Sequence, residues 1–306
     1  LRNRRQRQMC IRDSNYAFGV QINNETLDIE YNDLARAEFD SEGKITKTAD
    51  LFFLGGGQNV NQSRNKYGAF FEGEQELFDS LGLRLAARYE KVDNFSSLDP
   101  KISLSYNPMD QITLRISRGT SFTMPSMAQM YSSDINLGSV RDLEGSIFVR
   151  QARIGNPDLK PATSTNSNFG LIYNSDINRF SIDYWKIDYR DRIEAESAQD
   201  ILDLDPQGPS ITRNENGELI AVTTTYFNEE STLISGIDLS YEHIFDLSDN
   251  GILEFALKGT SLFKFLTPDQ TSDGTETVLT NRIGKFNFDT HTPVSYTHLR
   301  AHETLL

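Results

Sequence analysis

Apolar and polar side chains alternate at every second position along most of the chain, which is the period of a β-strand with one apolar face. The clearest case is 81–90, where leucine, alanine and tyrosine side chains face away from Arg84, Arg88 and Glu90. Little of the chain has a helical period, so the sequence predicts an all-β protein of about ten antiparallel strands. The other predicted strands are 16–22, 67–76, 102–106, 112–117, 169–173, 180–193, 233–245, 251–265 and 282–291.

The connections between these strands differ in length in a regular way. Four are short and rich in turn-forming residues: 79–80, 107–110, 175–178 and 246–250. Between them lie long polar stretches at 23–66, 119–165, 194–232 and 264–281, with a moderate one at 92–100. Successive connections of an antiparallel sheet lie at opposite ends, so one end is predicted to be trimmed and the other elaborated. That arrangement is typical of transmembrane β-barrels with external loops.

One of the long connections is predicted to carry a hairpin of its own. The segments 211–213 and 219–225 flank Asn216-Gly217, which is a strong signal for a tight β-turn. We expect this hairpin to stand above the membrane and not to cross it.

Composition narrows the possible partners. The net charge of −14 argues against nucleic-acid binding, because neutralising phosphates requires clustered Lys and Arg. Only 37% of the residues are hydrophobic, and no run approaches the roughly 20 apolar residues of a membrane helix. A barrel strand needs only one apolar face, so this low fraction is compatible with a membrane barrel. Cys10 is the only cysteine, which excludes a disulfide within the chain.

The two ends differ from the rest of the sequence. Residues 1–14 are rich in arginine, and both they and residues 294–306 resemble translated sequencing-adapter sequence. We therefore expect two non-native tails around a barrel portion at 15–293. A basic arm that binds nucleic acid or membrane is the alternative for the first tail.

Residue types that carry catalysis are sparse. Glu72, Glu74 and Glu76 alternate on one strand, which favours a solvated barrel interior over paired catalytic carboxylates. The chain has no nucleophile elbow, no phosphate loop and no ligand spacing for a metal, so we expect no catalytic residue, no metal and no cofactor. A set of aromatic residues is predicted to form the girdles at the membrane surfaces: Tyr16, Tyr67, Tyr89, Tyr173 and Trp185.

Ligand contacts are expected in the external loops, because binding residues favour loops held by a rigid scaffold. The long middle connection contains aromatic, cationic and amide side chains. The candidates for contact with a substrate are Tyr131, Arg141, Arg150, Arg153 and Asn156.

Four motifs follow one another between residues 117 and 245. The stretch 155–173 opens with Gly-Asn-Pro-Asp-Leu-Lys-Pro, whose prolines produce a stiff loop that enters a Ser/Thr/Asn-rich strand. The stretch 117–131 contains Ser-Phe-Thr-Met-Pro-Ser-Met, 184–193 ends in Asp-Arg-Ile, and 226–239 runs from Tyr-Phe-Asn to Ser-Gly-Ile-Asp-Leu.

Together, these motifs resemble those of TonB-dependent outer-membrane receptors. The family usually has Glu at the place of Ala162, and Arg and Ala at the places of Thr123 and Met124. The positions that match the family motifs, expected to be structural, are Pro125, Asn156, Pro157, Asp158, Leu159, Lys160, Pro161, Asn228 and Gly236.

The resemblance implies a 22-stranded antiparallel barrel of the outer membrane of a Gram-negative bacterium, of which this chain is expected to be a fragment without the plug domain. It implies energised uptake of a large, scarce nutrient of the siderophore, cobalamin or oligosaccharide class. The implied partners are outer-membrane lipid, the TonB complex acting through the plug, and the transported ligand. Two other functions stay open: a soluble β-rich carbohydrate-binding module, and an outer-membrane lipase on a small closed barrel.

Overall fold

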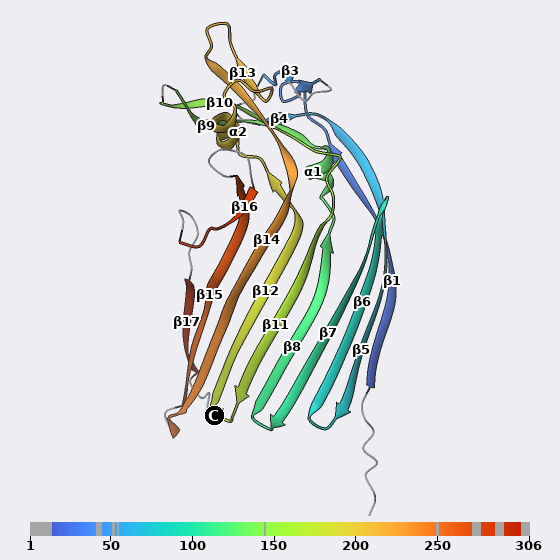
Figure 1. Cartoon of the computed structure of the whole chain (residues 1–306), viewed down its shortest axis with the longest axis vertical. Coiled ribbons are helices and arrows are strands. Elements are labelled where there is room, and N and C mark those ends of the chain that lie inside the picture. Colours follow the sequence, from blue (N-terminus) through green and yellow to red (C-terminus); the bar gives the residue numbers. More distant parts are fainter. Residues whose placement is uncertain are drawn as a thin grey trace, which may run out of the picture.

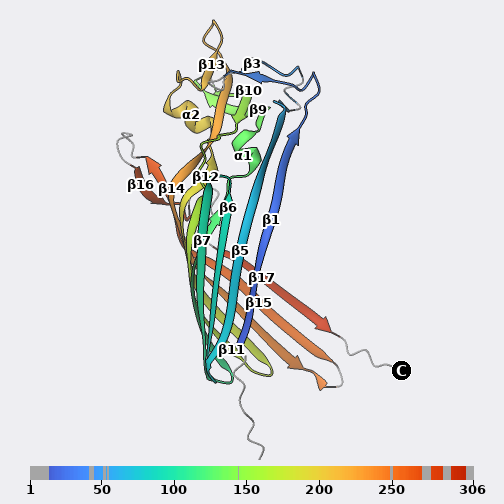
Figure 2. The ribbon, with the colours of Figure 1, turned by 90° about the vertical axis from the view of Figure 1, so that its right-hand side faces the viewer.

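A computed structural model describes residues 14–40, 45–50, 53, 55–143, 145–248, 251–270, 277–284 and 291–300. Ten long strands in this part of the chain form one curved antiparallel wall (Figures 1 and 2). In spatial order they are β1 (Ser14–Ile29), β5 (Val60–Phe78), β6 (Leu81–Val92), β7 (Phe95–Met109), β8 (Ile112–Thr123), β11 (Ala162–Asn174), β12 (Asn178–Ala195), β14 (Leu219–Asp246), β15 (Ile252–Gln270) and β17 (His291–Arg300). The predicted all-β architecture and number of strands are confirmed. Within the described residues the wall stays open, since β1 pairs only with β5 and β17 only with β15.

The ends of the wall differ as predicted. All the connections at the lower end of Figure 1 are short: β5–β6, β7–β8, β11–β12 and β14–β15. The upper end carries the long connections. One upper connection was predicted wrongly, because β6 and β7 join through Asp93 and Asn94 alone, with Asp93 in the left-handed region at φ 50°.

Several strands extend further than the alternation predicted. The predicted loop 23–66 is shorter, because β1 continues to Ile29 and β5 begins at Val60. In these upper segments most residues on both faces are polar, as in the pair of Asn61 and Asp28, so the ladder hydrogen bonds continue where the apolar signal has weakened. The strand predicted at 282–291 is wrong at its start, because 282–284 form no strand; 285–290 lie outside the described residues, and β17 starts at His291.

A cap of short elements covers the upper end (Figures 1 and 2). Its centre is the hairpin of β9 (Ser133–Asp142) and β10 (Gly145–Ile154), and β10 runs parallel to the upper part of β14. The predicted hairpin is confirmed, since β13 (Ile211–Arg213) pairs with β14. Its remaining elements are α1 (Met127–Tyr131), α2 (Ala198–Leu204), β4 (Gly56–Gly57), β2 (Glu38–Phe39) and β3 (Ile45–Lys47). The short strand β16 (Thr277–Asn281) pairs with the upper end of β15.

Two small apolar clusters hold the cap together, one on each face of the β9–β10 hairpin. Val140 and Val149 pack with Leu202 of α2 and Val222 of β14. On the other face, Ile135 and Ala152 pack with Ala37 and Ala49 from the connection between β1 and β5. The helices in the described part of the chain are too short and too polar to cross a membrane.

The assignment of the two tails stays a prediction. Residues 1–13 and 301–306 lie outside the described residues. Residues 291–300 form β17 and pair along their whole length with β15.

Candidate functional site

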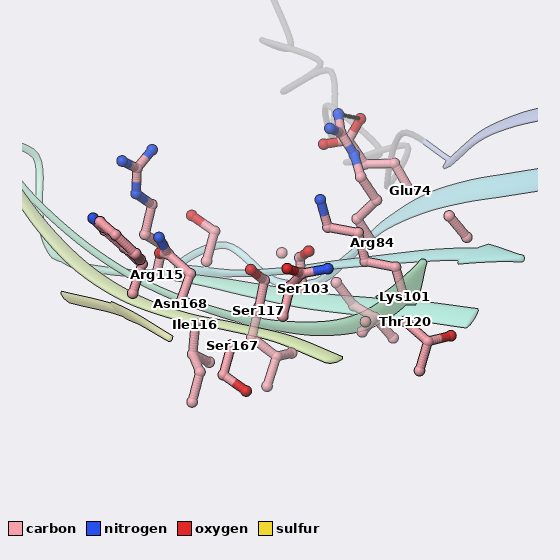
Figure 3. Close-up of a pocket in the computed structure, with 18 of the residues that line it drawn as sticks. Glu74, Arg84, Lys101, Ser103, Arg115, Ile116, Ser117, Thr120, Ser167 and Asn168 are labelled. Atoms are coloured by element: carbon pink, nitrogen blue, oxygen red, sulfur yellow. Dashed lines mark hydrogen bonds and ion pairs between the residues drawn. The ribbon is translucent and has the colours of Figure 1, made fainter. Parts of the chain in front are cut away.

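The concave side of the wall is polar. Hydrogen-bonded register places side chains of β5 to β12 on this face, around an elongated hollow of about 970 Å³ (Figure 3). Charged and hydroxyl or amide side chains line much of it: Glu72, Glu74, Arg84, Lys101, Ser103, Arg115, Ser117, Asn166 and Asn168. The solvated face predicted from the three alternating glutamates is therefore present, with cations opposite it.

Ion pairs cross the strands on this polar face. Arg84 contacts both Glu74, at 3.1 Å, and Glu72, at 3.6 Å. Arg115 makes a two-pronged contact with Asp183, Nη2 to Oδ2 at 2.6 Å and Nε to Oδ1 at 2.9 Å. Gly170 lies between these two residues, and a Cβ there would stand 2.0 Å from Asp183 Oδ1. Only glycine leaves room for the pair across β11.

The opposite face of the wall is apolar and exposed. Phe18 and Val20 of the edge strand β1 are more than 80% exposed. Tyr16, Tyr67, Tyr89 and Tyr173 share this face in the register, as their assignment to aromatic girdles requires. Trp185 does not: it is paired with Asn168 and Gly236 and lines the polar hollow. Its assignment to a girdle is wrong, because one step along a strand reverses the face.

A second group of polar side chains lies in the cap, where β10 meets β14. The guanidinium of Arg153 stands over the ring of Tyr226, 5.7 Å from its centroid. Asp134 is directly opposite Arg153 in the β9–β10 pair. Burial raises the pKa of Asp134, and the charge of Arg153 partly offsets that rise. The Nε of Arg153 is buried and has no hydrogen-bond partner within the described residues.

The five predicted ligand contacts are spread over the cap and do not form one cluster. Arg150 and Arg153 are three positions apart on β10 and so project from opposite faces. Arg150 donates to the hydroxyl of Thr48. Arg141 is exposed on β9, where its backbone bonds to Gln199 of α2. Tyr131 ends α1 and is half-buried.

Asn156 is held by hydrogen bonds within the chain. Its Nδ2 donates to the carbonyl oxygen of Tyr226 at 2.8 Å, and its Oδ1 accepts from the backbone of Asp158 at 2.9 Å. Whether any of the five residues touches a ligand stays a prediction. Sequence reasoning missed two titratable residues of the cap, Asp134 and Tyr31. Burial and the charge of Asp134 raise the pKa of Tyr31. No local pattern marks Asp134, because only the pairing of β9 with β10 brings it opposite Arg153. Tyr31 interacts with the charge of Asp134, which lies far from it in the sequence.

One ion pair is expected to make the stability of the cap depend on pH. Arg213 donates through Nη1 and Nη2 to the two carboxylate oxygens of Asp142, at 2.8 and 3.2 Å, and both side chains are at most 15% exposed. The hydrogen bond from Arg213 holds the pKa of Asp142 below its ordinary value, although burial opposes this. Because the pKa of Asp142 is lower in the folded state, its carboxylate stabilises the fold at pH values above its ordinary pKa of 3.8. This stabilisation is lost as the pH falls through the pKa of the folded state.

We therefore expect hydrogen exchange in the β13–β14 hairpin, corrected for intrinsic rates, to speed up as the pH falls from 6 to 3. The expected loss in the free energy of opening of this hairpin is about 1–2 kcal/mol. In the Asp142→Asn variant, hydrogen exchange in this hairpin should be fast at both pH values. The variant is the required reference, because the raised pKa of Asp134 gives the opposite pH dependence. Equal pH dependence in both proteins would contradict the assignment.

The fold defines a class of protein. A tilted antiparallel wall with one polar and one exposed apolar face, short turns at one end and a folded cap at the other, is the architecture of a transmembrane β-barrel. The family model described as TonB dependent receptor-like, beta-barrel, matches residues 3–297. The chain belongs to this family, and its wall lies in the bacterial outer membrane.

Individual relatives agree with the fold. Over 128 residues the chain is 27% identical to the probable TonB-dependent siderophore receptor PirA of Acinetobacter baumannii, covering 42% of this chain and 17% of that protein. A mutant of the ferric enterobactin receptor PfeA from Pseudomonas aeruginosa superposes with a TM-score of 0.58 and 17% identity, covering 85% of this chain and 35% of that one. The siderophore receptor PirA from Pseudomonas aeruginosa superposes with a TM-score of 0.55 and 15% identity, covering 87% of this chain and 44% of that one. The chain thus spans less than half the length of these relatives.

Proposed function

We propose that the protein containing this chain takes up an iron–siderophore complex across the outer membrane, with energy delivered by the TonB complex. Family membership supports a receptor-transporter, and the relatives' names support a siderophore rather than a cobalamin or an oligosaccharide. Proposed partners are the siderophore and the TonB complex, the latter acting through a plug domain.

The observation that carries the proposal most directly is the pairing of Arg153 and Tyr226 in the cap. A half-buried guanidinium over an aromatic ring is a site for an anionic, aromatic-rich ligand, because it offers charge-assisted donors beside a flat apolar surface. Below the cap, the polar hollow supplies a hydrated wall rather than an apolar barrier.

The test is uptake of radioactive iron, supplied as a ferric catecholate siderophore, by iron-starved cells that produce the protein. Uptake should require TonB, and Arg153→Ala should weaken binding to the cells about tenfold, from loss of one charge-assisted contact. Arg179→Ala is the matched control, since Arg179 is an exposed arginine near the lower end of β12. Uptake of cobalamin or an oligosaccharide, with none of ferric siderophores, would show that the substrate class is wrong.

A further inference from the structure

Five residues paired by register form a row across five strands of the wall; next to its last pair, between Ser235 and Gly236, the register of β14 against β15 shifts, which puts Lys264 opposite Ser235. Register pairs Arg118 of β8 with Ser167 of β11, Ser167 with Lys186 of β12, Lys186 with Ser235 of β14, and Ser235 with Lys264 of β15. We call these five residues the rim row. Neighbouring strands are about 4.8 Å apart, so successive cations of the row stand roughly 10 Å apart.

Strand register places the row on the face opposite the polar side chains, although Ser167 and Lys186 also border the hollow. Each of its members neighbours, along its own strand, a residue of the opposite face, such as Ser117, Asn168 and Gly236. Figure 3 shows this directly for one member, because Ser167 projects to the side opposite Asn168 and Ser117. The cations of the rim row are therefore presented to whatever surrounds the barrel.

Among the residues that the structure describes, no carboxylate neutralises the charge of the rim row. Within the described residues, none of its three cations forms an ion pair, whereas Arg84, Arg115 and Lys258 on the polar face each contact a carboxylate. Arg118 and Lys264 are exposed and Lys186 is half-buried. Asp188, two residues above Lys186 on the same face of β12, contacts Arg190 instead, at 3.7 Å.

The position of the row relative to the apolar band is well defined. Directly below it on the outward face come Ile116, Phe169, Tyr184 and Ile237, which are paired in one row. An aromatic-rich row followed by cations marks the level where acyl chains end and headgroups begin. The strands lean in Figure 1, so the rim row crosses this level obliquely, and the long stems of Arg and Lys let their charges reach one layer.

We propose that the rim row binds the phosphate groups of anionic lipids in the leaflet on the cap side of the membrane. The charge complements a phosphate, and the 10 Å spacing allows one phosphate to bridge two cations through their flexible stems. The apolar rows beneath hold the acyl chains of the same lipid, which a soluble anion lacks. This inference uses the location of the wall in the membrane and does not depend on which nutrient is transported.

The test is native mass spectrometry of the protein in neutral detergent, titrated with phosphatidylglycerol or with phosphatidylcholine. The wild type should retain phosphatidylglycerol preferentially, and R118Q/K186Q/K264Q should bind it roughly 100-fold more weakly, at roughly fivefold per cation. The control R84Q/K101Q/K258Q removes three cations from the polar face and should keep the preference.

If the triple variant does not fold, Lys264→Gln is compared with Lys258→Gln on the same strand. The first should lose roughly fivefold in affinity and the second should lose nothing. Equal losses in the paired variants, or unchanged affinity in the rim-row variant, would overturn the proposal. So would displacement of phosphatidylglycerol by millimolar inorganic phosphate, because the site would then recognise a free anion and not a lipid.

Discussion

Arg64→Ala is expected to lower the free energy of unfolding by about 3–4 kcal/mol, the cost of removing one partner from a buried charged network. Arg64 is 5% exposed; its Nε donates to Glu25 at 2.7 Å and its Nη1 to the carbonyl oxygen of Pro125 at 2.8 Å. It thereby joins the wall strands β1 and β5 to the segment that leads into α1. Without the guanidinium, the carbonyl of Pro125 loses its buried donor.

The measurements are urea unfolding of the protein in phospholipid vesicles, followed by circular dichroism, and protease cleavage within 124–131. Lys66→Ala is the matched control. Lys66 also contacts Glu25 but is 31% exposed, so its removal should cost under about 1 kcal/mol and leave cleavage unchanged. If both variants lose the same stability, the contact with Glu25 alone is responsible and the role of the Pro125 carbonyl is refuted.

Asn228→Ala is expected to cost about 2–3 kcal/mol and to free the loop at 156–161. The side-chain amide of Asn228 accepts from the backbone N–H of Lys160 at 2.8 Å and donates to its carbonyl oxygen at 2.9 Å, as a strand neighbour would. It also donates to the carbonyl oxygen of Asp191 in β12, whose φ of 52° lies in the left-handed region. One side chain thus ties the loop to two strands.

Asn228→Asp distinguishes this role from a loss of packing. The aspartate keeps the acceptor for the N–H of Lys160 but cannot donate to either carbonyl, so it should lose most of the stability at nearly unchanged volume. Hydrogen exchange at 158–162 measures the opening of the loop, and unfolding in urea measures the stability of the whole wall. An aspartate variant as stable as the wild type would show that the hydrogen bonds donated by Asn228 do not hold the loop.

These contacts explain motif positions that sequence comparison could only mark as structural. Leu159 is 1% exposed and anchors the loop between the two prolines, while Asn156 accepts from the N–H of Asp158 and Asn228 from that of Lys160. Pro125 is fully buried and offers its carbonyl to Arg64. At Gly236 a Cβ would lie 2.8 Å from the ring of Trp185, so glycine gives the indole its place on the polar face.

The elements of the site that were hard to predict depend on contacts between distant strands. The pairing of Arg153 with Asp134 and Tyr226 joins β9, β10 and β14, and Gly170 is required by two residues on other strands. None of these contacts changes the local period of the sequence. The short β6–β7 connection was missed for a related reason, since the polar upper ends of both strands look like loop when read alone.

Alternation and turn residues are local properties, so they suffice to predict antiparallel strands with one apolar face, short connections at one end and long ones at the other. The ordered motifs likewise point to the receptor family without coordinates. The length of each strand, the place of Trp185 on the polar face and the row of Arg118, Lys186 and Lys264 become visible only in the folded wall. Those facts depend on register, which hydrogen bonds between separated segments set and which a single strand does not encode.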